Sequence, residues 1–142
     1  LVEYDIENSR LVKEYIKGDT IAELLRNNCV DESMIYKMLL WEKMLKQKEV
    51  NIDYFPTNFV YNGNEIYYID YEYNTYSDEW SFSDWGIYYW LNPEGFRKFI
   101  ETGDSGWINI AGTGKPLINE GIAGKREIIL SRFLKENYAK AE

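Results

Sequence analysis

One stretch of the sequence, residues 51–72, restricts the fold more than any other. It holds an Asn-Gly pair at 62 and 63, between two short apolar runs at 59–61 and 66–69. Asn-Gly between such runs is a strong β-hairpin signal, because both residues tolerate the positive φ angles of tight turns. The second run ends beside the loop that precedes the first. The sequence therefore predicts a hairpin whose open end joins two loops.

Three polar residues stand at that open end. Asp53 and Asn58 precede the first strand, and Asp70 follows the second. Phosphoryl transfer needs an acceptor for the proton of the attacking hydroxyl, and oxygen ligands for Mg²⁺. The pattern indicates this chemistry, with Asp53 as proton acceptor and with Asn58 and Asp70 as metal ligands. In the alternative interpretation, Asp53 and Asn58 form Asx turns that only satisfy loop backbone.

The pattern Asp53-x-x-x-x-Asn58, then strand, turn, strand and Ile69-Asp70, resembles the catalytic loop and metal-binding segment of the protein-kinase-like superfamily. Its ending, Ile-Asp-Tyr-Glu, is similar to the small-molecule branch, which includes aminoglycoside and choline phosphotransferases and lipopolysaccharide-core sugar kinases. The resemblance implies ATP- and Mg²⁺-dependent transfer of phosphate to a small-molecule or sugar hydroxyl, with Asp53 and Asn58 as catalytic residues. Glu72 would bind or orient a second ion.

The start of the chain is predicted to form another hairpin. Residues 1–6 and 11–16 alternate apolar and polar side chains, and residues 7–10 have turn composition. The interpretation without a functional role is an ordinary edge hairpin packed on a helix. Its exposed edge also makes association of two copies a possible outcome.

The resemblance covers about residues 2–91 and implies an α+β fold. Residues 1–18 would be strands and hinge left from the N-lobe, and residues 19–142 a mostly helical kinase-like C-lobe. The adenine of ATP would hydrogen-bond to backbone groups near Glu14 and Ile16. The glycine-rich strands and the phosphate-binding lysine of the N-lobe are not in these residues. A complete phosphotransferase would therefore need a preceding segment.

Helical periodicity predicts the framework around the loops. Asp19 or Thr20 caps a short helix over 21–27, and Asp31 or Ser33 caps a long one over 31–48. The inward face of the long helix comprises Ile35, Met38, Leu39, Glu42 and Leu45. Its apolar part is widened by Met34, Leu40, Trp41 and Met44. Further helices are expected over 94–101 and 125–139. The inward residues of the last helix are Ile128, Ile129, Phe133 and Leu134.

Residues 77–91 are rich in aromatic side chains. Asp84 resembles the family's buried Asp that accepts hydrogen bonds from the catalytic-loop backbone, although a plain helix N-cap is an equal alternative. The rings of Trp80, Trp85 and residues 88–90 could stack a sugar or base near the acceptor. Such clusters more often form core, because each ring buries a large apolar area.

Three residues depart from the family pattern. Asn51 replaces a His that usually helps to hold the loop backbone, and an amide can do this in part. Phe55 replaces the Lys or His that stabilises the transferred phosphoryl group, and Lys13 stands where a small or apolar residue usually faces the adenine. Phe55, Lys13 and the missing N-lobe favour a second hypothesis, a pseudokinase-like binding module without catalysis. A third is an unrelated α+β domain in which the polar residues only form turns.

Charge and rare residues exclude several classes of function. Lys+Arg 16 against Asp+Glu 24 gives a net charge of -8, which disfavours nucleic acid as a partner. The absence of histidine removes His-based zinc sites and imidazole catalysis. The single cysteine, Cys29, cannot form an internal disulfide, and we expect it to be buried in a cytoplasmic protein. No apolar run is long enough to span a bilayer.

Overall fold

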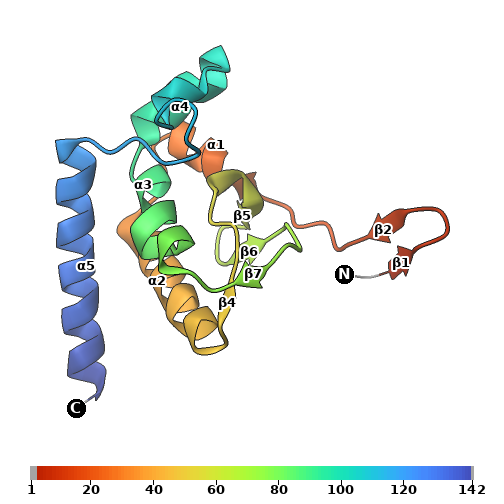
Figure 1. The fold of residues 1–142 in the computed structure, drawn as a ribbon, viewed down its shortest axis with the longest axis horizontal. Coiled ribbons are helices and arrows are strands. Elements are labelled where there is room, and N and C mark those ends of the chain that lie inside the picture. The colour runs from red at the N-terminus through yellow and green to blue at the C-terminus, as the bar shows by residue number, and fades with distance from the viewer. Residues whose placement is uncertain (1–2, 142) are drawn as a thin grey trace.

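Between residues 3 and 141, which the computed structural model describes, the chain forms five α-helices and seven short strands (Figure 1). The helices are α1 (Ile21–Arg26), α2 (Glu32–Gln47), α3 (Ile87–Trp90), α4 (Pro93–Thr102) and α5 (Glu120–Ala141). The strands are β1 (Glu3–Asp5), β2 (Arg10–Val12), β3 (Asp19–Thr20), β4 (Val50–Asn51), β5 (Phe59–Tyr61), β6 (Ile66–Tyr68) and β7 (Asn74–Thr75). The predicted α+β class is confirmed.

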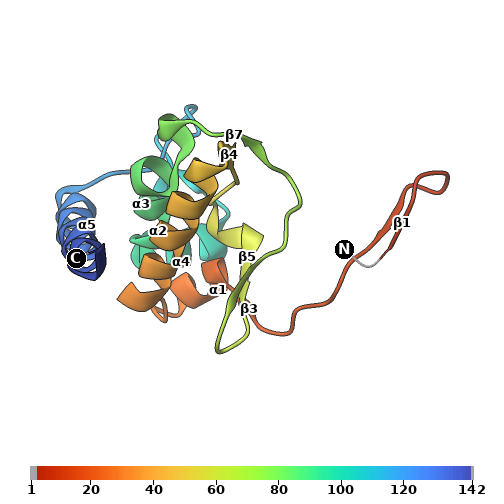
Figure 2. The ribbon, with the colours of Figure 1, turned by 90° about the horizontal axis from the view of Figure 1, so that it is seen from below.

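Helix α2 lies at the centre of the body, with α3 and α5 on one side and the β5–β6 hairpin on the other (Figure 2). Its predicted cap is confirmed, because an Asp31 side-chain oxygen accepts a hydrogen bond from the Met34 backbone N–H. The apolar stripe is narrower than predicted, since Leu40 and Met44 are about half exposed. Glu42 lies on the inward face, where Oε1 accepts hydrogen bonds from the backbone and hydroxyl of Ser83.

The largest side chains of the core between these elements are aromatic. The ring of Phe59 lies 5.4 Å from that of Trp90 and 5.2 Å from that of Tyr68, measured between centroids. The largest fully buried side chains are Trp90, Tyr54, Tyr89, Phe59, Phe82 and Phe96. Such rings contribute both large buried area and favourable edge contacts. They hold the loop before β5 against α3.

Two small sheets support the loops of residues 51–72. The predicted hairpin is confirmed, with Phe59 opposite Tyr68 and Gly63 at a φ of 99° in the turn. Strand β3 adds to its outer edge by pairing with β5, and then leads directly into α1. The other sheet pairs β4 with β7, with Val50 opposite Thr75. Neither β3 nor β7 is predicted from the sequence.

The β1–β2 hairpin projects away from the body (Figures 1 and 2). Its strands pair as predicted, with Tyr4 opposite Leu11, but each is only three residues long. Residues 13–16 form no strand, and the predicted strand residues Leu1 and Val2 lie outside the described part of the chain. The hairpin does not pack on a helix, so the interpretation as an ordinary edge hairpin on a helix is wrong.

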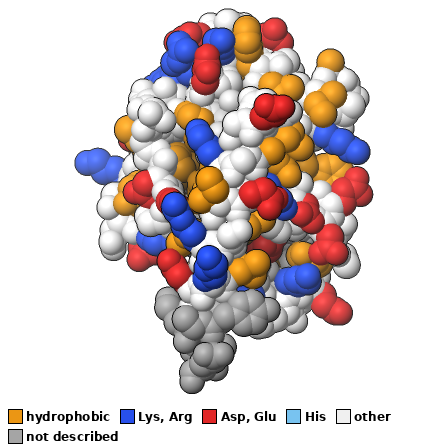
Figure 3. Space-filling view, turned by 90° about the vertical axis from the view of Figure 1, so that its left-hand side faces the viewer, with side chains coloured by type: hydrophobic (Ala, Val, Ile, Leu, Met, Phe, Trp, Pro, Cys, Tyr) orange, Lys and Arg blue, Asp and Glu red, His pale blue; other side chains and the backbone are white. Residues whose placement is uncertain are grey.

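Helix α5 covers α3 and begins five residues before its predicted start. Ile122 and Ile129 are buried and Phe133 packs on Tyr36, whereas Ile128 and Leu134 are exposed, contrary to prediction. Figure 3 shows charged side chains of both signs, with apolar ones between them, on the face that α5 helps to form.

Two further properties of the described residues bear on the sequence-based expectations. Cys29 is exposed, and not buried as predicted, because it follows the end of α1 in the turn toward α2. Within residues 3–141 none of the helices combines the length and apolar character needed to cross a membrane.

Candidate functional site

The loop between β4 and β5 is held from beneath by buried aromatic residues. The Tyr54 side chain is fully buried, with its ring 5.4 Å from the Phe82 ring. The indole Nε1 of Trp90 donates a hydrogen bond of 2.8 Å to the Tyr54 carbonyl oxygen. Because successive side chains in this extended loop point in different directions, burial of Tyr54 leaves the neighbouring Asp53 exposed.

Asp53 and Asn58 are joined by hydrogen bonds within this loop. Asp53 Oδ1 accepts a bond of 3.0 Å from the Phe55 backbone N–H, and Asn58 Nδ2 donates one of 3.2 Å to the Asp53 carbonyl. The Asx turn considered in the sequence analysis is therefore present. Even so, Asp53 Oδ2 and Asn58 Oδ1 receive no hydrogen bond from another described residue. Both oxygens remain available to a ligand.

Asp70 lies next to this loop because the hairpin ladder continues past β5 and β6. The Ile69 backbone N–H donates a hydrogen bond of 2.9 Å to the Asn58 carbonyl. Asp70 Oδ1 accepts a weak bond of 3.3 Å from the Glu72 N–H, in a second Asx turn. The structure thus brings Asp53, Asn58 and Asp70 to the same end of the hairpin, as the sequence predicts.

Tyr68, which sequence reasoning missed, lies at the centre of this group. Its hydroxyl accepts a hydrogen bond of 3.3 Å from the Asp53 N–H and donates one of 2.9 Å to the Glu72 carbonyl. Burial raises the pKa of Tyr68, the Asp53 N–H opposes that shift, and the charges of Asp70, Asp53 and Glu72 add to it. The Tyr68 hydroxyl thus links the backbone of the Asp53 loop to that of Glu72.

A cleft of about 360 Å³ opens on the Asp53 side of this group. Trp80 and Trp85 form one wall, with their rings 5.6 Å apart at an interplanar angle of 65°. The full lining comprises Asn51, Ile52, Asp53, Glu72, Asn74, Thr75, Trp80 and Trp85. None of these lining residues is basic, so the cleft is acidic with an aromatic wall.

Asn51 connects the bottom of this cleft to the aromatic segment. Its Nδ2 donates a hydrogen bond of 3.0 Å to the Trp80 carbonyl. The residue is only 5% exposed, and its Oδ1 has no partner among the described residues. Asn51 therefore holds the backbone of the segment that carries the tryptophan wall, and not that of the catalytic loop as the resemblance implies.

A second cavity, of about 400 Å³, is lined in part by Tyr68. Glu14 and Ile16 line it together with Val60, Tyr67 and Ile69. The backbone groups of Glu14 and Ile16 form no hydrogen bond with another described residue. Lys13, which departs from the family pattern, also lines this cavity, and its Nζ donates a hydrogen bond of 2.8 Å to the Ile69 carbonyl. Lys13 therefore ties residues 13–18, which join β2 to β3, to the segment that carries Asp70.

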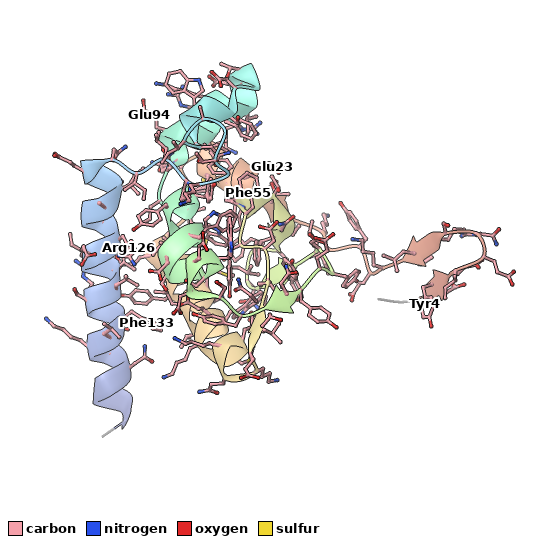
Figure 4. All side chains as sticks on the ribbon, viewed as in Figure 1. Tyr4, Glu23, Phe55, Glu94, Arg126 and Phe133 are labelled. Carbon is pink, nitrogen blue, oxygen red and sulfur yellow. The ribbon has the colours of Figure 1, made fainter. Side chains whose placement is uncertain are left out.

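Phe55 is absent from the cleft lining because it belongs to the core (Figure 4). Its ring packs against those of Tyr89, at 5.1 Å, and Phe96, at 5.7 Å. The side chain at this position therefore points away from the ligand-accessible side of the loop.

The interpretation of Asp84 as a buried support of the loop is wrong. Its side chain is 53% exposed and pairs with Arg126 of α5 at 3.1 Å. It is not the N-cap either, because Ser81 caps the π-helical turn Phe82–Gly86 by accepting the Asp84 N–H. Trp90 is the side chain that holds the loop backbone.

Ionisation of Tyr89, which packs under the loop, should affect the stability of the fold at alkaline pH. Burial and the Asp53 charge raise the pKa of Tyr89 to about 12. Because this lies above the value of about 10 in an unfolded chain, the associated stability is present below pH 10 and is lost as the pH rises through 12. Urea unfolding at about pH 8 and at about pH 11 measures how far the free energy of unfolding falls between the two. In Tyr89→Phe this fall should be smaller than in the parent protein by roughly 1.4 kcal/mol. An equal loss in both proteins would contradict the assignment.

No three Asp, Glu, Cys or His side chains of residues 3–141 converge into a group that could hold a metal ion. No family model, curated protein or solved structure matches the chain. What the site does is therefore inferred from its geometry.

Proposed function

We propose that this chain carries the catalytic loop of an ATP- and Mg²⁺-dependent phosphotransferase of the protein-kinase-like type, acting on a hydroxyl of a small molecule or sugar. The observation that carries the proposal is the ladder bond from the Ile69 N–H to the Asn58 carbonyl. That bond brings Asp70 to the loop of Asp53 and Asn58, and Asp53 lines the acidic cleft.

The cavity lined by Glu14 and Ile16 suits the nucleotide. The unpaired backbone groups of Glu14 and Ile16 can hydrogen-bond to an adenine edge, and Val60 and Ile69 offer apolar contact to its faces. Ile69 directly precedes Asp70. A nucleotide seated here therefore extends its phosphates toward the proposed metal ligands.

The donor atoms near Asp70 fit Mg²⁺. Asn58 Oδ1 and the carboxylate of Asp70 are hard oxygen ligands, and Mg²⁺ is usually bound by one or two carboxylates with water and phosphate oxygens. When bound, the ion neutralises charge on the phosphates. Asn58 keeps its side chain oriented by donating Nδ2 to the Asp53 carbonyl.

The acidic cleft suits the acceptor. Asp53 borders the cleft, and its Oδ1 is oriented by the Phe55 N–H, while Oδ2 can accept the proton of an acceptor hydroxyl. The rings of Trp80 and Trp85 offer apolar faces against which a sugar can stack. Asp53 then orients the hydroxyl for transfer.

Asp70→Asn tests the proposal. In the intact protein the affinity for ATP with Mg²⁺ should fall at least about ten-fold, because even outer-shell changes at metal sites cost 10–100-fold. Calorimetric titration with and without a chelator separates the metal-dependent part. Glu65→Gln is the matched control, since Glu65 is an exposed acid in the turn of the same hairpin. Affinity that is unchanged by Asp70→Asn would remove the metal-binding role.

A pseudokinase-like binding module is the second candidate, and two observations favour it. The described residues that line the acceptor cleft include no Lys or Arg, and Phe55 faces the core. Such a protein would bind nucleotide and acceptor without phosphate transfer. Saturable binding of ATP together with no transfer from the intact protein would decide for this candidate.

A further inference from the structure

A third cavity, of about 580 Å³, shares no lining residue with the two cavities of the candidate site. It lies between the end of α1, the start of α4 and the start of α5. Three basic side chains line it, Arg26, Arg97 and Lys125, each from a different helix. We call it the basic cavity.

The positive charge of the basic cavity is largely uncompensated. Arg26 and Lys125 form no hydrogen bond or ion pair with another described residue. Arg97 lies 3.8 Å from Glu101, which is too long for a hydrogen bond. The acidic lining residue, Glu94, is engaged by Lys98 at 3.3 Å. In a chain with a net charge of -8, three cations gathered around one cavity mark a site for an anion.

The floor of the basic cavity is apolar. Leu25, Leu91 and Ile122 line it and are buried. A smaller cavity of about 140 Å³ adjoins it, shares Leu25, Leu91 and Lys125, and reaches Trp90 and Ile35. Asp31 and Glu32 also line this smaller cavity, but Asp31 accepts the Met34 N–H and Glu32 pairs with Arg132 at 3.0 Å. A ligand that filled both would need an apolar part beside its charged group.

We propose that the basic cavity binds a small organic anion. A phosphate or carboxylate head group is held by Arg26, Arg97 and Lys125, and an apolar part of a few carbons rests on Leu25, Leu91 and Ile122. Guanidinium groups suit such heads because their planar donors match two oxygens at once. The asparagines at the rim supply further donors. This site does not depend on the proposed phosphotransferase activity.

Calorimetric titration of the intact protein with phenyl phosphate, benzoate and inorganic phosphate tests the proposal. We expect saturable binding of phenyl phosphate with one site per chain, and weaker binding of inorganic phosphate, which lacks an apolar part. Benzoate distinguishes a carboxylate head from a phosphate head. Arg26→Gln, Arg97→Gln and Lys125→Gln should each weaken phenyl phosphate binding about ten-fold, the value of one charge-assisted hydrogen bond.

Lys43→Gln is the matched control, because Lys43 is an exposed cation on α2 outside the cavity. It should leave the affinity unchanged, as should Asp70→Asn, which reports on the candidate site alone. No saturable binding of either organic anion, or an equal loss in Lys43→Gln, would overturn the proposal. The three lining cations are exposed, so unfolding midpoints of the Gln variants should match the parent and exclude misfolding as the cause.

Discussion

Replacing Asp53 by Asn should lower Mg²⁺-dependent phosphate release from ATP by at least about 100-fold in the intact protein, the usual cost of losing a general base. Asn retains an Oδ1 that can accept the Phe55 N–H, so the turn that orients residue 53 is preserved. What is lost is the second carboxylate oxygen, the proposed proton acceptor. A coupled assay of phosphate release, with water as acceptor, measures the change without knowledge of the natural acceptor.

Asp104→Asn provides a matched control for this substitution. Asp104 also accepts a backbone N–H two residues later, from Gly106 at 2.8 Å, but lines neither cavity of the candidate site. Its variant should release phosphate at the parent rate. If Asp53→Asn retained the parent rate as well, Asp53 would not be the base. If the parent protein itself bound ATP but released no phosphate, the binding-module candidate would be supported.

Trp90→Ala should lower the free energy of unfolding by about 3–5 kcal/mol, as large-to-small changes of buried aromatic residues do. Trp90 is 1% exposed, and its ring packs on Phe59 and Phe82. Its indole N–H also satisfies the Tyr54 carbonyl, which would otherwise be buried and unpaired. Urea unfolding at neutral pH measures the loss.

Two variants separate packing from the hydrogen bond. Trp90→Phe keeps most of the ring and removes the donor to Tyr54, so it should cost about 1–3 kcal/mol. Trp107→Ala is the matched tryptophan control. Trp107 is 40% exposed with Lys98 over its ring, and its loss should cost about 1 kcal/mol or less. A Trp90→Ala cost as small as that of Trp107→Ala would contradict the central role of Trp90.

Features set by neighbouring residues could be predicted from the sequence. Thr20 accepts the Glu23 N–H at the start of α1, and Asp31 begins α2, because a cap needs only a side chain two or three residues away. The turn at Gly63 likewise carries its own signal. Once this turn sets the register, Asp70 must approach Asn58, so the predicted meeting of these residues followed from local chemistry.

Features set by distant partners could not be predicted. Strands β4 and β7 have two residues each, and no periodicity marks so short a strand before its partner is known. Ser81 and Asp84 are both good caps, but Ser81 is the cap and Asp84 pairs instead with Arg126, 42 residues later, which no local pattern reveals. Tyr68 carried one signal that could have revealed it: it alternates with Ile66, so both face the core side of β6.

The β4–β7 pairing has a consequence for the kinetics of folding. Val50 and Thr75 close a single loop that contains Asp53, Asn58 and Asp70. The entropy lost in closing a loop of this length is modest, and contacts near in sequence form early. Assembly of the three polar residues therefore does not wait for α5 or for the projecting hairpin. In native-state hydrogen exchange, the loop should open and close as one cooperative unit.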